Sequence, residues 1–226
     1  RALRDDTWLR LDASPAPDGR AGSVAAFDDS AGVYVMFGGD EEPFDARIAE
    51  GETWTFDGEE WTDLAPTPSP QHRTEGHPVL FELAMDYDSG SRRIVLLIGG
   101  DETWGFDTLS ATWEQRTAPD SAADYMIAAA YHAGIDRTIT YGGAPTALTQ
   151  ETWGYDYDID TWELIPTAST PGPIGDHAMA YDPATDAVYL FGGVTEPLGL
   201  GDPESPSARM WRFDGTDWSL VWDPGG

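Results

Sequence analysis

One pattern of residues occurs four times along this chain, and each copy contains a Gly-Gly pair. In the first copy the run Val33–Phe37 leads into Gly38 and Gly39, and Trp54-Thr55-Phe56-Asp57 and Trp61 follow. The later Gly-Gly pairs begin at Gly99, Gly142 and Gly192, and their closing tryptophans are Trp113, Trp162 and Trp218. A repeat of about 50 residues with this content is typical of a propeller blade, so it predicts a β-propeller.

Each copy contains four short segments with strand character. An apolar segment such as His177–Asp182 is followed by a turn rich in Asp, Gly or Ser, and then by the segment that ends in Gly-Gly. The Trp-x-aromatic-Asp segment and the closing Trp segment complete the copy. Because no helical stripe exceeds two turns, we predict an all-β fold with four antiparallel strands per copy, named a to d outward from the axis. The glycine pairs are expected to adopt positive φ and to allow close backbone contact.

The spacing of the copies predicts one β-propeller domain over 1–226. Its predicted blades are 20–64, 73–116, 124–165 and 174–221. Asp6-Thr7-Trp8 matches Asp160-Thr161-Trp162, so we predict that 1–14 is the outer strand of an incomplete blade. A blade without a neighbour leaves one face uncovered, and such a face tends to associate with other protein surfaces. Three alternatives therefore stay open: further sequence completes the ring, four blades close alone, or chains self-assemble through the incomplete edges.

The repeat resembles the kelch repeat in its bacterial form, as found in domains similar to the central domain of galactose oxidase. The residues that carry the resemblance are His177–Asp182, Val188–Gly193, Glu151-Thr152-Trp153 and Asp160-Thr161-Trp162. It spans Arg20 to Val221 and implies a kelch-type propeller. One departure concerns the Arg-x-Gly-His box that usually opens kelch strands: here Arg20 and His177 survive in different copies, so no role of the box is carried over.

Composition limits the partners. The net charge is −29, from 41 acidic and 12 basic residues, and Lys, Asn and Cys are absent. Adaptation to high salt and a codon bias against Lys and Asn are both consistent with this composition. A field of this sign argues against nucleic acid or an anionic membrane as a partner. No apolar run approaches the ~18 residues that cross a bilayer, so membrane insertion is not predicted.

The predicted binding face is the one where the b–c and d–a loops meet in related propellers. The b–c loops are long in the first and fourth copies and short in the other two, which suggests a shaped groove. Neutral drift in tolerant loops is an equally open explanation. The candidate binding residues on this face are Arg20, His72, Arg73, His77, His177, Asp101 and Glu102.

Four carboxylates that follow Gly-Gly pairs form the candidate metal site. Asp40, Glu41, Asp101 and Glu102 offer oxygen ligands suited to Ca²⁺, and a hydrated acidic rim is the alternative. No other cofactor is predicted. Nine of the ten tryptophans occupy repeat columns and are expected in the core, whereas Trp222 is expected to pack at the end of the fold. His132 replaces a turn Asp and is expected to be exposed.

Two functions from different classes remain. The first is a non-catalytic binding or scaffold module, extracellular or at the cell surface, whose loop-rich face binds a protein or a glycan. The alternative is a sugar-active enzyme similar to kelch-type mutarotases or lyases, with Arg20, Arg73, His77 or His177 acting on a carboxylated sugar. A copper oxidase is excluded, because the site that the resemblance implies needs a Tyr crosslinked to Cys and the chain has no Cys.

Overall fold

A computed structural model of the chain describes residues 13–39, 51–71, 83–99, 102–119, 127–143, 149–195 and 206–225. Within these ranges the regular secondary structure consists of strands, arranged as four antiparallel four-stranded sheets. The sheets are the four blades of a β-propeller, as the repeat predicts. The additional outer strand predicted at 1–14 falls largely on residues 1–12, outside the described residues.

Each blade uses four consecutive strands. The first blade comprises β1 (Val24–Asp28), β2 (Val33–Phe37), β3 (Thr53–Phe56) and β4 (Trp61–Asp63). The second comprises β5 (Leu83–Asp88), β6 (Arg93–Ile98), β7 (Glu102–Asp107) and β8 (Thr112–Arg116). The third comprises β9 (Ala128–His132), β10 (Arg137–Tyr141), β11 (Thr152–Asp156) and β12 (Thr161–Ile165). The fourth comprises β13 (Gly175–Asp182), β14 (Ala187–Val194), β15 (Met210–Phe213) and β16 (Trp218–Trp222).

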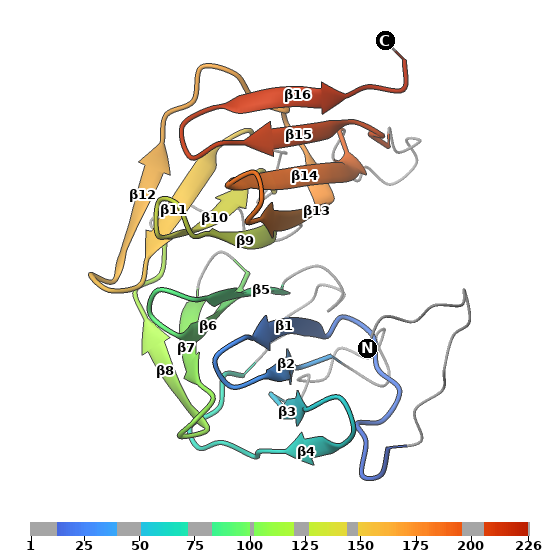
Figure 1. Cartoon of the computed structure of the whole chain (residues 1–226), viewed down its shortest axis with the longest axis vertical. Helices are drawn as coiled ribbons and strands as arrows, with labels where there is room; N and C mark the ends of the chain where they lie inside the picture. Colours follow the sequence, from blue (N-terminus) through green and yellow to red (C-terminus); the bar gives the residue numbers. More distant parts are fainter. Residues whose placement is uncertain are drawn as a thin grey trace.

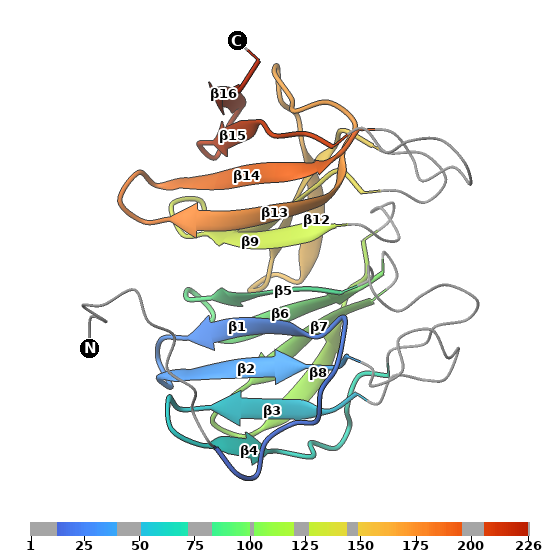
Figure 2. The same cartoon turned by 90° about the vertical axis from the view of Figure 1, so that its right-hand side faces the viewer.

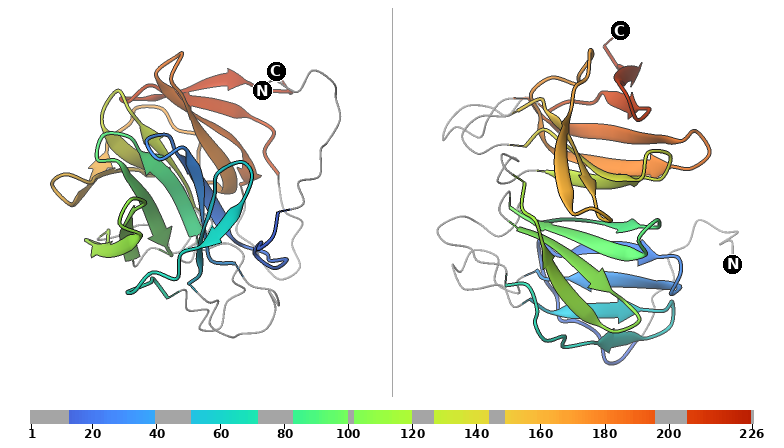
Figure 3. Two further views of the ribbon diagram at one scale, coloured as in Figure 1. Left: turned by 60° about the horizontal axis from the view of Figure 1, so that its bottom comes forward. Right: turned by 90° about the vertical axis from the view of Figure 1, so that its left-hand side faces the viewer.

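The first strand of every blade lies at the centre and the fourth at the periphery (Figure 1). The inner strands contact one another in the order β1, β5, β9, β13, so the first and fourth blades are the two ends of the row. The right-hand view of Figure 3 shows the outer strands β8 and β12 of the two middle blades toward the viewer. In Figure 2 strand β1 points to the left, where the a–b turns lie, and β2 points to the right, toward the b–c connections.

The aspartate of each Trp-x-aromatic-Asp segment forms the turn between strands c and d. One carboxylate oxygen accepts hydrogen bonds from the backbone N–H groups two and three residues further on, as in an Asx turn. The four equivalent residues are Asp57, Asp107, Asp156 and Asp214, with N···O distances between 2.8 and 3.2 Å. The repeated Asp is therefore a structural residue in all four blades.

The Gly-Gly pairs have positive φ, as predicted. Gly38 and Gly39 have φ of 68° and 85°, and Gly142 has φ of 66°. A Cβ at Gly39 would lie 2.9 Å from the Cβ of Ser23, and one at Gly142 would overlap the carbonyl oxygen of Ile174. Both conformation and space therefore require glycine where strand b leaves the blade.

The blades are joined by one repeated interface. We call the face of a blade that carries the closing Trp its indole face and the opposite face its threonine face. At each internal interface the indole N–H donates to a Thr hydroxyl of the preceding blade. The three pairs are Trp113 with Thr53 at 2.9 Å, Trp162 with Thr103 at 3.2 Å, and Trp218 with Thr152 at 2.9 Å. Three apolar clusters, one for each interface, form the core.

Candidate functional site

The structure describes three of the nine predicted site residues. Asp40, Glu41, His72, Arg73, His77 and Asp101 lie outside the described residues. Arg20, Glu102 and His177 are described, and they belong to the first, second and fourth blades. No contact between these three residues is found in the described part of the chain, so their proposed common role stays a prediction.

Arg20 is held by groups of its own blade. Its guanidinium lies 2.9 Å from a carboxylate oxygen of Glu52 and donates to the carbonyl oxygen of Gly38 at 3.2 Å. The hydrogen bond from the Trp54 indole, together with Arg20, lowers the pKa of Glu52 against the effect of partial burial. The Arg20 side chain is 9% exposed. Arg20 thus ties the segment before β1 to the ends of β2 and β3.

Glu102 takes part in a contact that recurs along the chain. Its carboxylate accepts a hydrogen bond of 2.6 Å from the indole N–H of Trp104 two residues later. Glu52 and Glu151 accept the same bond from Trp54 and Trp153. The signal in the sequence is a Glu-Thr-Trp triplet at the start of strand c in three copies, which the candidate metal site did not take into account.

His177 is buried in the interface between the third and fourth blades. It is 7% exposed, and its ring lies edge-on to Tyr141 with centroids 6.2 Å apart. Neither ring nitrogen has a hydrogen-bond partner in the described part of the structure. Burial lowers the pKa of His177 to about 4. At neutral pH the imidazole is therefore uncharged, and it lacks the acidic proton of an imidazolium that a general acid would give.

The prediction for His132 was wrong. This residue is 1% exposed, because it lies on the threonine face of the third blade and packs against Tyr181 and Phe213 of the fourth. Burial lowers the pKa of His132. Trp222 is 50% exposed at the end of the outermost strand, so its expected packing there is only partial.

A cavity that the sequence did not reveal lies at the opposite end of the blades, beside the a–b turns. Its volume is about 550 Å³, and all four inner strands contribute to its wall. Aromatic side chains and two carboxylates distinguish the lining. These residues are Phe27, Tyr87, Tyr131, Tyr181, Asp29 and Asp86. Aromatic faces and carboxylates both favour positively charged groups, so this cavity suits a cation better than an anion.

Asp86 is a partly buried carboxylate of this cavity. It occupies a position that is Ala26, Ala130 and Ala180 in the other three inner strands. Its two oxygens accept hydrogen bonds from the backbone N–H groups of Tyr131 at 2.7 Å and Tyr87 at 2.8 Å. Burial raises the pKa of Asp86. The Asp86 side chain of β5 is therefore joined to β9 by a hydrogen bond from the Tyr131 backbone N–H.

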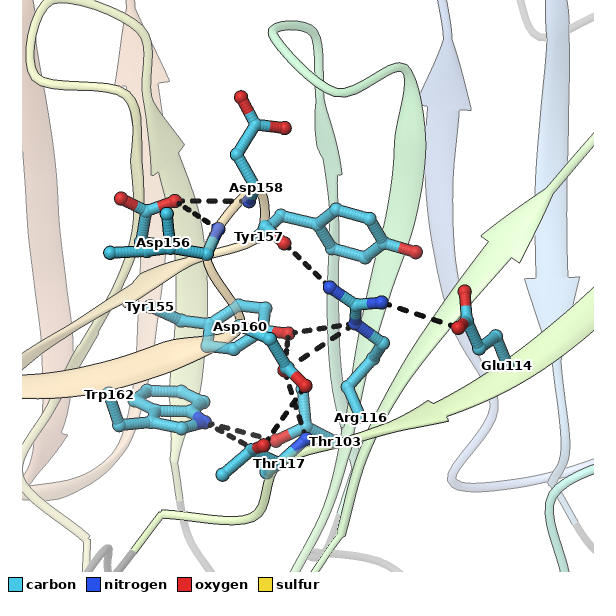
Figure 4. A network of polar contacts seen from close by, with 11 residues as sticks. Thr103, Glu114, Arg116, Thr117, Tyr155, Asp156, Tyr157, Asp158, Asp160 and Trp162 are labelled. Carbon is cyan, nitrogen blue, oxygen red and sulfur yellow. Dashed lines mark hydrogen bonds and ion pairs between the residues drawn. The ribbon is translucent and has the colours of Figure 1, made fainter.

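A second polar cluster connects the outer parts of the second and third blades (Figure 4). The guanidinium of Arg116 donates to the carbonyl oxygen of Tyr157 at 2.7 Å and stacks on the Tyr157 ring, 4.3 Å from its centroid. Asp160 accepts from the hydroxyl of Tyr155 at 2.7 Å and from Thr117. Although partial burial acts to raise the pKa of Asp160, these hydrogen bonds outweigh it and lower the pKa. The cluster is structural, since its polar groups are bonded to one another.

Replacing Arg116 with alanine is expected to reduce the free energy of unfolding by about 2 kcal/mol, because the change removes a charge-assisted hydrogen bond and a cation–π contact. Arg116→Lys should recover less than half of this loss, since lysine lacks the planar fork. Urea denaturation measures both variants. Arg209→Ala is the matched control: Arg209 pairs with Asp223 but is 53% exposed, and we expect a loss below about 0.5 kcal/mol. Equal losses for Arg116→Ala and Arg209→Ala would contradict this account.

The described ranges contain no group of three or more His, Asp or Glu side chains placed to hold a metal ion. Three of the four carboxylates of the candidate Ca²⁺ site lie outside those ranges, so the site stays a prediction. Within the same ranges the chain also has no helix that is long and apolar enough to cross a bilayer.

Comparison with known proteins gives one distant match. No family model matches the chain. In an alignment 174 positions long, which covers 70% of the chain, the sequence is 27% identical to the human protein Multiple epidermal growth factor-like domains protein 8. The match covers 6% of the length of that protein, so this chain is similar to a small part of it. The β-propeller fold is shown by the structure itself. Because no family model matches, the resemblance to kelch repeats stays a prediction from the repeated residues.

Proposed function

We propose that the chain is a non-catalytic binding module whose loop-rich face binds a protein or a glycan. The observation that carries this proposal is that equivalent strands run in the same direction in all four blades. Strands a and c begin at one face of the propeller, and strands b and d end at that same face. The b–c and d–a connections of unequal length therefore emerge together from a rigid frame. Propellers commonly use such loops for binding, because a rigid scaffold can position variable segments.

The state of the described polar residues supports binding without catalysis. Arg20 is bonded to Glu52 and Gly38, and Glu102 accepts a bond from Trp104. His177 is buried and uncharged at neutral pH. The alternative is a sugar-active enzyme that uses Arg20, Arg73, His77 or His177 on a carboxylated sugar. Of these residues, Arg20 would first have to leave Glu52 and Gly38, and Arg73 and His77 lie outside the described residues. No contact in the described structure favours that alternative.

The setting proposed for this module is extracellular or at the cell surface. The distant similarity to a human protein named for epidermal growth factor-like domains supports this setting. The net charge of −29 is consistent with neutral glycans and with cationic protein surfaces as ligands. Salt adaptation and codon bias both stay open as origins of this charge.

Replacing Arg73 and His77 with alanine tests the proposal. We expect binding on a glycan array, or to a captured protein ligand, to weaken at least about tenfold, which corresponds to about 1.4 kcal/mol. We also expect that neither the original chain nor the variant accelerates the mutarotation of glucuronic acid, measured by NMR. Arg92→Ala, in the turn after β5 at the opposite end, is the control and should bind normally. Turnover by the original chain that the double variant loses, with its fold intact, would establish the enzyme instead.

A further inference from the structure

The three internal interfaces of the propeller show which face of a blade fits which. In each of them the indole face of one blade covers the threonine face of the blade before it, and an indole-to-threonine hydrogen bond joins the two. Large side chains pack around this bond. For example, Trp113 of the second blade lies 5.3 Å, ring to ring, from Phe37 of the first blade. The interface thus has a polarity, from indole face to threonine face, that repeats along the chain.

In the described part of the chain no further sheet lies beyond the first and fourth blades, so one face of this type at each end of the row has no blade against it (Figure 1). The indole face of the first blade is formed by Phe27, Tyr34, Phe56 and Trp61, which pair across its four strands, and by Met36 and Trp54. Met36 and Trp54 are buried, so the exposed part of this face is centred on Phe27 and Tyr34. Tyr34 is 50% exposed, whereas Ile94 and Val188, which occupy the same position in the second and fourth blades, are 0% exposed. The position is the same in the three blades, but among the described residues no blade packs against Tyr34.

The threonine face of the fourth blade is exposed in the same way. It is formed by Ala178, Ala180, Tyr189 and Phe191, with Met210 and Arg212 on strand c and Trp222 on strand d. Phe191 is 46% exposed, whereas Phe37 and Tyr141 at the same position in the first and third blades are 0% exposed. The chain therefore carries one uncovered face of each kind, and these two kinds pack together three times within the same molecule.

We propose that these two faces bind each other between two copies of the chain, head to tail, with the indole face of the first blade on the threonine face of the partner's fourth blade. The proposal goes beyond ligand binding by the loops. Each copy can satisfy both of its open faces in this way, and two such contacts close a ring of about eight blades, a size that propellers adopt. The contact continues the interface already present inside the chain, with the same polarity.

One residue weakens the proposed contact in a defined way. The position on strand c that is Thr53, Thr103 and Thr152 in the first three blades is Met210 in the fourth. The indole of Trp61 therefore meets no threonine hydroxyl on the partner. The net charge of −29 on each copy also opposes association. We accordingly expect association that strengthens as added NaCl screens this repulsion.

Sedimentation velocity of the whole chain, over a range of concentrations and from 0.1 to about 1 M NaCl, measures the association. Tyr34→Asp and Phe191→Asp should each weaken it at least about tenfold, because each places a charge in an apolar contact. Met210→Thr should strengthen it about fivefold by restoring the acceptor. Leu109→Asp and Ile159→Asp are the matched controls, since these side chains are 89% and 66% exposed in turns at the edges of blades. Circular dichroism confirms that every variant is folded.

A mixing experiment tests the polarity of the contact. The Tyr34→Asp variant retains an intact threonine face, and the Phe191→Asp variant retains an intact indole face. Equal amounts of the two should therefore associate more tightly than either variant alone. A chain that is monomeric at every concentration and salt level would overturn the proposal. So would association that neither aspartate variant weakens, or a mixture that behaves like the separate variants.

Discussion

Trp113→Ala is expected to lower the free energy of unfolding by about 3–5 kcal/mol, the cost of removing a large aromatic side chain from a core. Trp113 is 3% exposed and packs against Phe37 and Phe106 with ring centroids 5.3 and 4.7 Å away. Its loss also leaves the hydroxyl of Thr53 buried without its donor, which adds to the cost. Urea denaturation followed by tryptophan fluorescence and circular dichroism measures the change.

The control for this substitution is another tryptophan of the same chain. Trp222 is 50% exposed, so Trp222→Ala should cost less than about 1 kcal/mol. Thr53→Val isolates the interblade hydrogen bond, since it removes the hydroxyl while keeping the shape, and should cost about 1–3 kcal/mol by leaving the indole N–H unsatisfied. Similar losses for Trp113→Ala and Trp222→Ala would show that the blades are not joined through this column of indoles.

Replacing His177 with leucine is expected to flatten the dependence of stability on pH. In the folded chain the pKa of His177 is about 4, against 6.5 for the unfolded side chain. Below pH 6.5 the unfolded chain binds a proton that the folded chain does not, so stability falls as the pH drops from 6.5 toward 4. The total contribution is on the order of 3 kcal/mol. Above pH 6.5 the imidazole is neutral in both states and makes no contribution.

Urea denaturation at pH 7.5 and at pH 4.5 measures the effect in both proteins. At pH 7.5 the His177→Leu variant should be at least as stable as the original chain, because leucine fills the same apolar site without two unpaired nitrogens. At pH 4.5 it should be more stable by about 2–3 kcal/mol. Carboxylates such as Asp86 also titrate in acid, but they are common to both proteins and cancel in the comparison. Parallel pH profiles would mean that His177 is accessible to protons in the folded chain.

The features that the sequence predicted are those that each copy encodes by itself. Alternation of apolar residues, turn-forming aspartates such as Asp57 and the positive φ of Gly39 depend on neighbours along the chain. Four copies of the same signal made the blades recognisable. The predicted burial of the repeated tryptophans is confirmed for Trp54, Trp104, Trp113 and Trp218, which are 2–9% exposed. Trp61, Trp153, Trp162 and Trp211 are only partly buried.

The features that the sequence did not reveal arise between copies. His132 occupies a turn position by its place in the repeat, but the neighbouring blade covers it. Asp86 replaces an alanine of the repeat and lies beside Tyr131, which is 45 residues away along the chain. The cavity beside the a–b turns is lined by the four inner strands, and none of these strands contains a binding motif of its own. A single sequence does not show these contacts, because they depend on how the blades are placed around the axis.

Hydrogen exchange of the indole N–H groups, followed by NMR with Trp→Phe assignments, tests most directly whether the four sheets are packed face to face through these bonds. We predict that the indole protons of Trp113 and Trp218, buried and bonded to threonine hydroxyls, exchange slowly. The indole proton of Trp222, a half-exposed side chain, should exchange at a rate close to that of a free indole. Exchange of Trp113 and Trp218 as fast as that of Trp222 would contradict the propeller described here.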